Sequence, residues 1–171
     1  MVHHNHVRWR PPAGDVVKIN YDGAIFSEEG RVGLGVVCHN SEGVVIASLS
    51  EQIPLPATIT QVEALAARRA AVFAVELGIT MAVLEGDSDI VYKDLSSTDP
   101  SLTPHGHIIH DVKLLASYFS CFLFSHTRRQ GNGVAHALAR RAINSPNQNV
   151  WMDNMPLDIL HVVLADIAFL V

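Results

Sequence analysis

Three carboxylates occupy positions from which they could do acid or metal chemistry. Asp22 lies within the alternating stretch DVVKINYDGAIF, Glu63 lies early in an Ala-rich helical segment, and Asp87 directly follows the apolar run ITMAVLEG. Carboxylates that gather in one place raise each other's pKa values unless a divalent cation neutralises them. Hard oxygen ligands favour Mg²⁺ or Mn²⁺. Two such ions about 3.5–4 Å apart can hold the attacking and leaving oxygens of a phosphodiester displacement.

Each carboxylate also has a purely structural explanation. Asp22 followed by Gly23 is typical of a hairpin turn. The sequence TQVE, from Thr60 to Glu63, matches a capping box, and Asp87 is well placed to cap a helix. Asp89 is interpreted as a first-turn residue that complements the helix dipole. The combination of the three carboxylates is therefore more specific than any one of them.

Two histidines raise a similar question. His136 lies within the apolar helical stretch GVAHALA and is compatible with a core residue, a surface residue or a ligand. His126 lies at the end of the apolar run SCFLFSHT. It is either a polar residue at a strand end or a general acid or base, because the ordinary pKa of histidine suits proton transfer near neutral pH.

The period of the apolar residues predicts the elements that must position these side chains. Alternation predicts three strands joined by the short turns SEEG and SEG, as in an antiparallel meander. The period then changes to that of helices separated by short apolar strands. The expected strands are 15–26, 31–40, 44–52, 79–86 and 120–127, and the expected helices are 60–77, 87–97, 107–119 and 132–143. This order predicts an α/β fold with a five-stranded mixed sheet, in which strands 1–3 are antiparallel and the later strands parallel, flanked by helices on both faces.

The chain has 171 residues, which suits one domain. We expect an extended N-terminal arm at 1–14, the domain at 15–145 and a C-terminal tail at 146–171 that docks on it. The net charge of −5 argues against a strongly basic nucleic-acid binder. No apolar run reaches the roughly 18 residues of a membrane span, and the N-terminus lacks the apolar core of a secretory signal. We therefore expect a soluble intracellular protein, in the cytoplasm or nucleus, with Cys38 and Cys121 as buried free thiols.

Four stretches follow one another in a specific order: KINYDGA, QVEALAARRAA, LEGDSDIV and RRQGNGVAHALAR. In this order they resemble the four motifs of type 1 ribonuclease H. The resemblance is to the plant branch of reverse-transcriptase-like RNase H domains, related to those of non-LTR retroelements, which often begin with an arm like WRPP at 9–12. It covers roughly residues 9–143 and implies an RNase H-like fold.

The resemblance also implies an activity, namely metal-dependent endonucleolytic hydrolysis of the RNA strand of RNA–DNA hybrids. Asp22 would bridge two metal ions, and Glu63 and Asp87 would complete one site. The fourth acidic ligand of the family falls at His136, so the chain departs from the four-carboxylate pattern. His126 would match a loop histidine thought to assist proton transfer or product release in bacterial relatives. Because imidazole suits Mg²⁺ less well than Mn²⁺, we predict weak activity in Mg²⁺ and relative rescue by Mn²⁺.

Hybrid recognition would rest on shape, phosphates and 2′-OH groups rather than on reading of bases. Gly23 would let a nucleic-acid backbone approach closely. Arg128, Arg129 and Asn132 are the candidates for phosphate contacts.

Two alternatives to this enzyme stay open. The first is a non-catalytic nucleic-acid-binding or interaction module, which His136 and the acidic net charge favour. The second is a related exonuclease of the same superfold, which the motif order and spacing fit less well. Gly33 and Gly35, on one face of the second strand, are explained equally well by a nucleic-acid backbone or by close helix packing.

Overall fold

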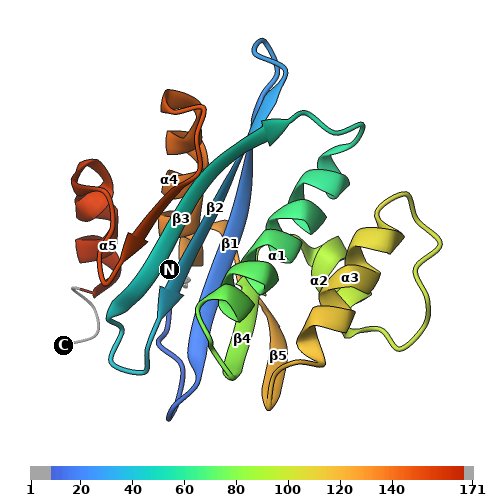
Figure 1. Ribbon diagram of the computed structural model, residues 1–171, viewed down its shortest axis with the longest axis horizontal. Helices are drawn as coiled ribbons and strands as arrows, with labels where there is room; N and C mark the ends of the chain where they lie inside the picture. Colours follow the sequence, from blue (N-terminus) through green and yellow to red (C-terminus); the bar gives the residue numbers. More distant parts are fainter. Residues whose placement is uncertain (1–8, 168–171) are drawn as a thin grey trace, which may run out of the picture.

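The computed structural model describes residues 9–167 (Figure 1). The first eight residues of the predicted arm and the last four of the predicted tail lie outside the described residues. The segment boundaries at 14 and 145 stay a prediction. The strands are β1 (Val17–Phe26), β2 (Arg31–His39), β3 (Val45–Pro54), β4 (Met81–Gly86), β5 (Cys121–His126) and β6 (Asn149–Met152). The α-helices are α1 (Ile59–Glu76), α2 (Asp89–Ser96), α3 (Gly106–Ala116), α4 (Gly133–Arg141) and α5 (Leu160–Ile167). Short 3-10 turns are η1 (Arg129–Gly131), η2 (Ala142–Asn144) and η3 (Leu157–Ile159).

The strands form one mixed sheet in the order β5–β4–β1–β2–β3–β6. β1, β2 and β3 form the expected antiparallel meander, whereas β4 runs parallel to β1 and β5 runs parallel to β4. The predicted mixed sheet is confirmed, but the prediction of five strands is wrong. The sixth strand, β6, pairs antiparallel with the outer edge of β3. It has only four residues, NVWM, and their apolar and polar side chains do not alternate, so the pattern did not predict a strand.

Helices cover both faces of the sheet (Figure 1). α1, α2 and α3 lie on one side, and α4 and α5 lie on the other. The larger apolar core lies between the sheet and the α1 side, and a smaller one joins Val37 of β2 to α4 and the α5 segment. This two-sided cover explains why the central strands carry almost continuous buried residues.

Two glycines of β2 allow α4 to approach the sheet closely. A Cβ atom on Gly33 would lie 1.9 Å from the carbonyl oxygen of Ala139, and one on Gly35 would lie 2.1 Å from that of Ala135. Both distances are far below van der Waals contact, so no side chain fits. Close helix packing is therefore the correct explanation of these two glycines.

Both cysteines are free thiols, as expected, with Cys38 buried and Cys121 half-buried. Within residues 9–167, none of the helices combines the length and the apolar character needed to cross a membrane.

Candidate metal centre

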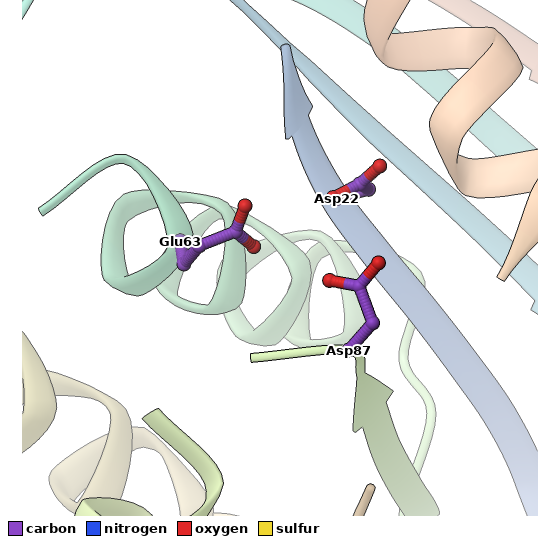
Figure 2. Close-up of side chains that lie close together, drawn as sticks. All are labelled: Asp22, Glu63 and Asp87. Atoms are coloured by element: carbon purple, nitrogen blue, oxygen red, sulfur yellow. The ribbon is translucent and has the colours of Figure 1, made fainter. Parts of the chain in front are cut away.

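Three carboxylates meet where β1 and β4 diverge. The two strands pair as far as Asn20 and Glu85. Asp22 follows on β1, Asp87 is the first residue after β4, and Glu63 comes from the first turns of α1. One oxygen of each carboxylate lies within 4.8 Å of the others. Figure 2 shows the three side chains pointing toward one another. We call Asp22, Glu63 and Asp87 the carboxylate cluster.

The start of α1 does not use Glu63 as a cap. The hydroxyl oxygen of Thr58 accepts a hydrogen bond from the backbone N–H of Gln61 at 3.2 Å. The side-chain oxygen of Gln61 accepts one from the backbone N–H of Thr58 at 3.1 Å. The capping box therefore spans Thr58–Gln61, and the alternative box from Thr60 to Glu63 is wrong.

The structural roles considered for the two aspartates, a turn for Asp22 and a helix cap for Asp87, are also wrong. Ser88, not Asp87, caps α2, because its hydroxyl oxygen accepts a hydrogen bond from the backbone N–H of Val91 at 3.3 Å. Asp22 is not in a turn, since β1 continues through Phe26. Asp89 lies in the first turn of α2 as expected. All three cluster carboxylates are thus available to a ligand.

Burial and mutual repulsion make the carboxylate cluster electrostatically unfavourable on its own. Burial and the nearby Asp22 and Asp87 raise the pKa of Glu63 to about 8, against a weaker lowering by Arg129. Burial and Asp87 raise the pKa of Asp22 to about 6, although the hydrogen bond from His136 opposes this. One oxygen of Glu63, Oε2, is buried and has no hydrogen-bond partner among residues 9–167. A divalent cation would relieve both the repulsion and this unpaired atom.

His136 contacts the cluster from the opposite face of the sheet. It lies in the first turn of α4, and its Nδ1 is 2.7 Å from Oδ2 of Asp22. When that carboxylate is ionised, Nδ1–H donates to it, which leaves Nε2 as the free ring nitrogen. The side chain is 33 % exposed, so it is neither a core residue nor a fully solvated one. It reaches one carboxylate of the cluster rather than standing among all three.

His126 lies at the edge of the same site. Its Nε2 is 3.2 Å from the backbone carbonyl oxygen of Asp87, and its ring lies beside that of Tyr92, with centroids 5.9 Å apart. The residue is exposed. The structure therefore brings His126 next to the cluster, in a place open to solvent.

The residues predicted to contact nucleic acid differ in their exposure to solvent. Arg128 and Arg129 are exposed at η1, and Arg129 is close enough to act on Glu63. Asn132 is only 2 % exposed, and its Nδ2 donates to the backbone carbonyl of Tyr21 at 2.9 Å. Its position therefore contradicts a phosphate contact by this side chain. At Gly23, an added Cβ would lie 2.4 Å from Cγ1 of Val62, so this glycine first of all accommodates α1.

Sequence reasoning missed a set of buried polar side chains next to the cluster. Asn20, Glu85 and Trp9 are all buried, and they bond to one another rather than to solvent. One indication was present, because Asn20 lies on the same face of the first strand as Asp22. Tyr21, on the other face, is fully buried beside Gly86, where an added Cβ would lie 2.3 Å from the phenol ring. Burial, followed by the nearby carboxylates, raises the pKa of Tyr21 beyond its usual range.

Comparison with known proteins places these features in a family. Residues 20–142 match the model of a family described as reverse transcriptase-like. This span contains all three members of the carboxylate cluster, together with His126 and His136. No curated protein matches the chain in sequence.

Several solved structures share the fold. The RNase H1 of Halobacterium salinarum is 28 % identical, with a TM-score of 0.68 over 75 % of this chain and 97 % of that one. The N-terminal RNase H domain of a Mycobacterium tuberculosis protein is 25 % identical, with a TM-score of 0.67 over 77 % and 95 %. LC11-RNase H1, isolated from compost, has been solved in complex with an RNA/DNA hybrid. In that complex it is 20 % identical over 75 % and 96 % of the two chains, with a TM-score of 0.66, which shows the fold alone. None of these three proteins bears on the plant branch, which stays a prediction.

Proposed function

The chain belongs to the reverse transcriptase-like family, and we propose that it is a metal-dependent endoribonuclease that hydrolyses the RNA strand of RNA–DNA hybrids. The observation that carries the proposal is the carboxylate cluster, with its buried and unpaired Glu63 oxygen. The likeness of the chain to RNase H1 enzymes, one of them at 28 % identity, supports the same activity. The hybrid bound to LC11-RNase H1 supports the choice of substrate.

The residues fit a hard divalent cation, Mg²⁺ or Mn²⁺. Asp22, Glu63 and Asp87 offer only oxygen atoms, which these ions prefer. Burial and the neighbouring carboxylates raise the pKa values of Asp22 and Glu63, and a bound cation would offset both effects. Asp22, Glu63 and Asp87 would hold one ion, and His136 would be a ligand of a second. When bound, such ions neutralise phosphate charge and lower the pKa of a bound water. The imidazole at the second position favours Mn²⁺ over Mg²⁺.

The protein's own side chains orient the site and handle protons. The hydrogen bond between Nδ1 of His136 and Asp22 fixes the ring, so that Nε2 faces away from the carboxylate. His126, exposed beside Asp87, would take up or return a proton at its ring nitrogen. Arg128 and Arg129, exposed at η1, would contact backbone phosphates.

A non-catalytic binding module is the second candidate. Two observations favour it, the histidine at position 136 and the net charge of −5. The retention of all three cluster carboxylates favours the enzyme.

A cleavage assay with matched variants separates the two candidates. The substrate is a hybrid labelled on its RNA strand, with RNA–RNA and DNA–DNA duplexes of the same sequence as controls. In Mn²⁺, the wild type should cut only the hybrid, and Asp22→Asn should lower the rate by at least about 10²-fold, because a charge that organises the site is lost. Asp89→Asn makes the same chemical change on the exposed surface of α2 and should leave the rate unchanged. If the wild type is as inactive as Asp22→Asn but still binds the hybrid, the protein is a binding module.

A further inference from the structure

A buried polar network connects the N-terminal arm with the helix that carries His136. The indole Nε1–H of Trp9 donates to Oδ1 of Asn20 at 2.9 Å. Nδ2 of Asn20 donates to Oε2 of Glu85 at 2.9 Å and to Oδ1 of Asn132 at 3.2 Å. Each of the four side chains is buried. We call Trp9, Asn20, Glu85 and Asn132 the arm network.

Residues 9 and 10 of the arm are held in place from two sides. The ammonium group of Lys18 donates to the backbone carbonyl of Arg10 at 2.7 Å and lies 3.3 Å from Oε2 of Glu85. The Trp9 ring packs against His39, with centroids 4.3 Å apart, and is only 5 % exposed. Trp9 is therefore a fixed part of the structure, although it precedes the span that matches the family.

The far end of the network reaches His136 through Asn132. The side chain of Asn132 donates to the carbonyl of Tyr21, the residue directly before Asp22. The backbone carbonyl of Asn132 accepts the N–H of His136 at 3.1 Å. Asn132 thus ties the first turn of α4 to β1 at the place where His136 meets Asp22.

The amide of Asn20 makes this arrangement depend on Trp9. An amide has an oxygen that accepts and an NH₂ group that donates, and only one of its two orientations fits here. The indole donor requires the oxygen to face Trp9, which turns the NH₂ group toward Glu85 and Asn132. Without that donor, the oxygen of Asn20 is left buried and unpaired, and the preference between the two orientations is weakened.

We propose that Trp9 is a positioning residue for the candidate metal centre. Its indole N–H orients Asn20, Asn20 orients Asn132, and Asn132 holds the first turn of α4 so that His136 faces Asp22. The consequence for catalysis rests on the proposed function, whereas the effect on the position of His136 does not.

The decisive variant is Trp9→Phe, which keeps an aromatic ring against His39 but removes the N–H donor. The imidazole signals of His136 and the side-chain amide signals of Asn132 are followed by NMR in the metal-free protein. The control is Val112→Ala, which shortens a buried side chain of α3, in the core on the other side of the sheet. Trp9→Phe should shift these signals well beyond any change in the control. Shifts no larger than those of Val112→Ala, at equal loss of thermal stability, would overturn the proposal.

Two further measurements keep the test decisive. If Trp9→Phe does not fold, Lys18→Met removes the ammonium group that holds the Arg10 carbonyl and pairs with Glu85, while Trp9 and Asn20 themselves stay unchanged. The same signals are followed in this variant. If the wild type cleaves hybrid, Trp9→Phe should lower kcat by about tenfold through misplacement of the site, with KM unchanged. If the wild type does not cleave, the proposed function fails, and the NMR comparison still decides the role of Trp9.

Discussion

The arm network and the carboxylate cluster are neighbouring groups of buried polar side chains near β1 and β4. The side chains of the network are paired with one another, whereas the cluster contains an oxygen that is unpaired within residues 9–167. In the arm network, Glu85 accepts hydrogen bonds from Asn20 and Ser125 and pairs with Lys18. The carboxylate cluster begins two residues after Asn20 and Glu85, at Asp22 on β1 and at Asp87 directly after β4. There Oε2 of Glu63 has no partner in the described part of the chain. A buried polar atom is normally paired, and a cation among the three carboxylates would pair this one. The paired network stabilises the positions of β1 and β4, whereas the cluster has this unpaired oxygen, which a cation would bind.

The largest effect is expected when the central residue of the arm network, Asn20, loses its side-chain amide. Asn20→Ala removes three hydrogen bonds. They join the Asn20 amide to the indole N–H of Trp9, to Oε2 of Glu85 and to Oδ1 of Asn132. We expect the free energy of unfolding to fall by about 3 kcal/mol, because buried groups lose their hydrogen bonds. Urea unfolding measures this loss. Asn147→Ala, at an exposed asparagine, is the matched control, and an equal loss in both variants would show that the network is not structural.

The opposite sign is expected in the carboxylate cluster. The pKa of Glu63 is raised from 4.5 to about 8. The protonated group therefore favours the folded state fully below pH 4.5, and this contribution is lost as the pH rises through 8. Glu63→Gln removes this loss, so the metal-free variant at pH 8 should melt about 2–4 °C higher for each kcal/mol gained. Thermal unfolding from pH 5 to 9 measures this.

Two controls sharpen that second prediction. Glu28→Gln changes an exposed carboxylate in the turn after β1 and should leave the pH dependence as it is in the wild type. Mn²⁺ should raise the melting temperature of the wild type more than that of Glu63→Gln. A wild type whose stability does not fall between pH 5 and 9 would contradict the raised pKa of Glu63.

His136 tests which ion the open site prefers. Replacing it by aspartate restores a fourth carboxylate, and we expect about a tenfold higher rate in Mg²⁺ with a smaller gain in Mn²⁺. The ratio of the two cleavage rates in each metal is the measurement. Equal activity of the wild type and His136→Asp in Mg²⁺ would show that the imidazole does not set the metal preference.

The smallest effect is expected at the edge of the site. Arg129→Ala should weaken hybrid binding a few-fold and reduce the salt dependence of binding by about one phosphate contact. Titrations at several salt concentrations give the slope. Lys113→Ala removes the same charge from α3 and should leave the slope unchanged. Equal slopes in the two variants would remove Arg129 from the phosphate contacts.

The sequence allowed the main elements and the three carboxylates to be predicted, because strand alternation and motif order are local features. The capping box was predicted at Thr60 and Glu63, although Thr58 and Gln61 fit the same rule. Only the entry of the chain into α1 selects the box at Thr58 and Gln61.

The orientation of Asn132 was equally hidden. Position alone suggested a phosphate contact at a helix start, but the side chain turns inward to the Tyr21 carbonyl. That choice depends on a strand more than a hundred residues earlier in the chain. The role of Trp9 has the same long-range origin, because its partner Asn20 lies on the strand that also carries Asp22.

The glycine contacts of β2 bear on how this site can change. Gly35 lies directly opposite Asp22 in the sheet and touches the backbone of Ala135, the residue before His136. The distance of α4 from the sheet is therefore set by the absence of side chains on β2, independently of what residue 136 is. The side chain at position 136 can therefore be exchanged without rebuilding the scaffold. The same contacts make Gly35 itself intolerant of exchange, because even one methyl group would push the helix and its histidine away from Asp22.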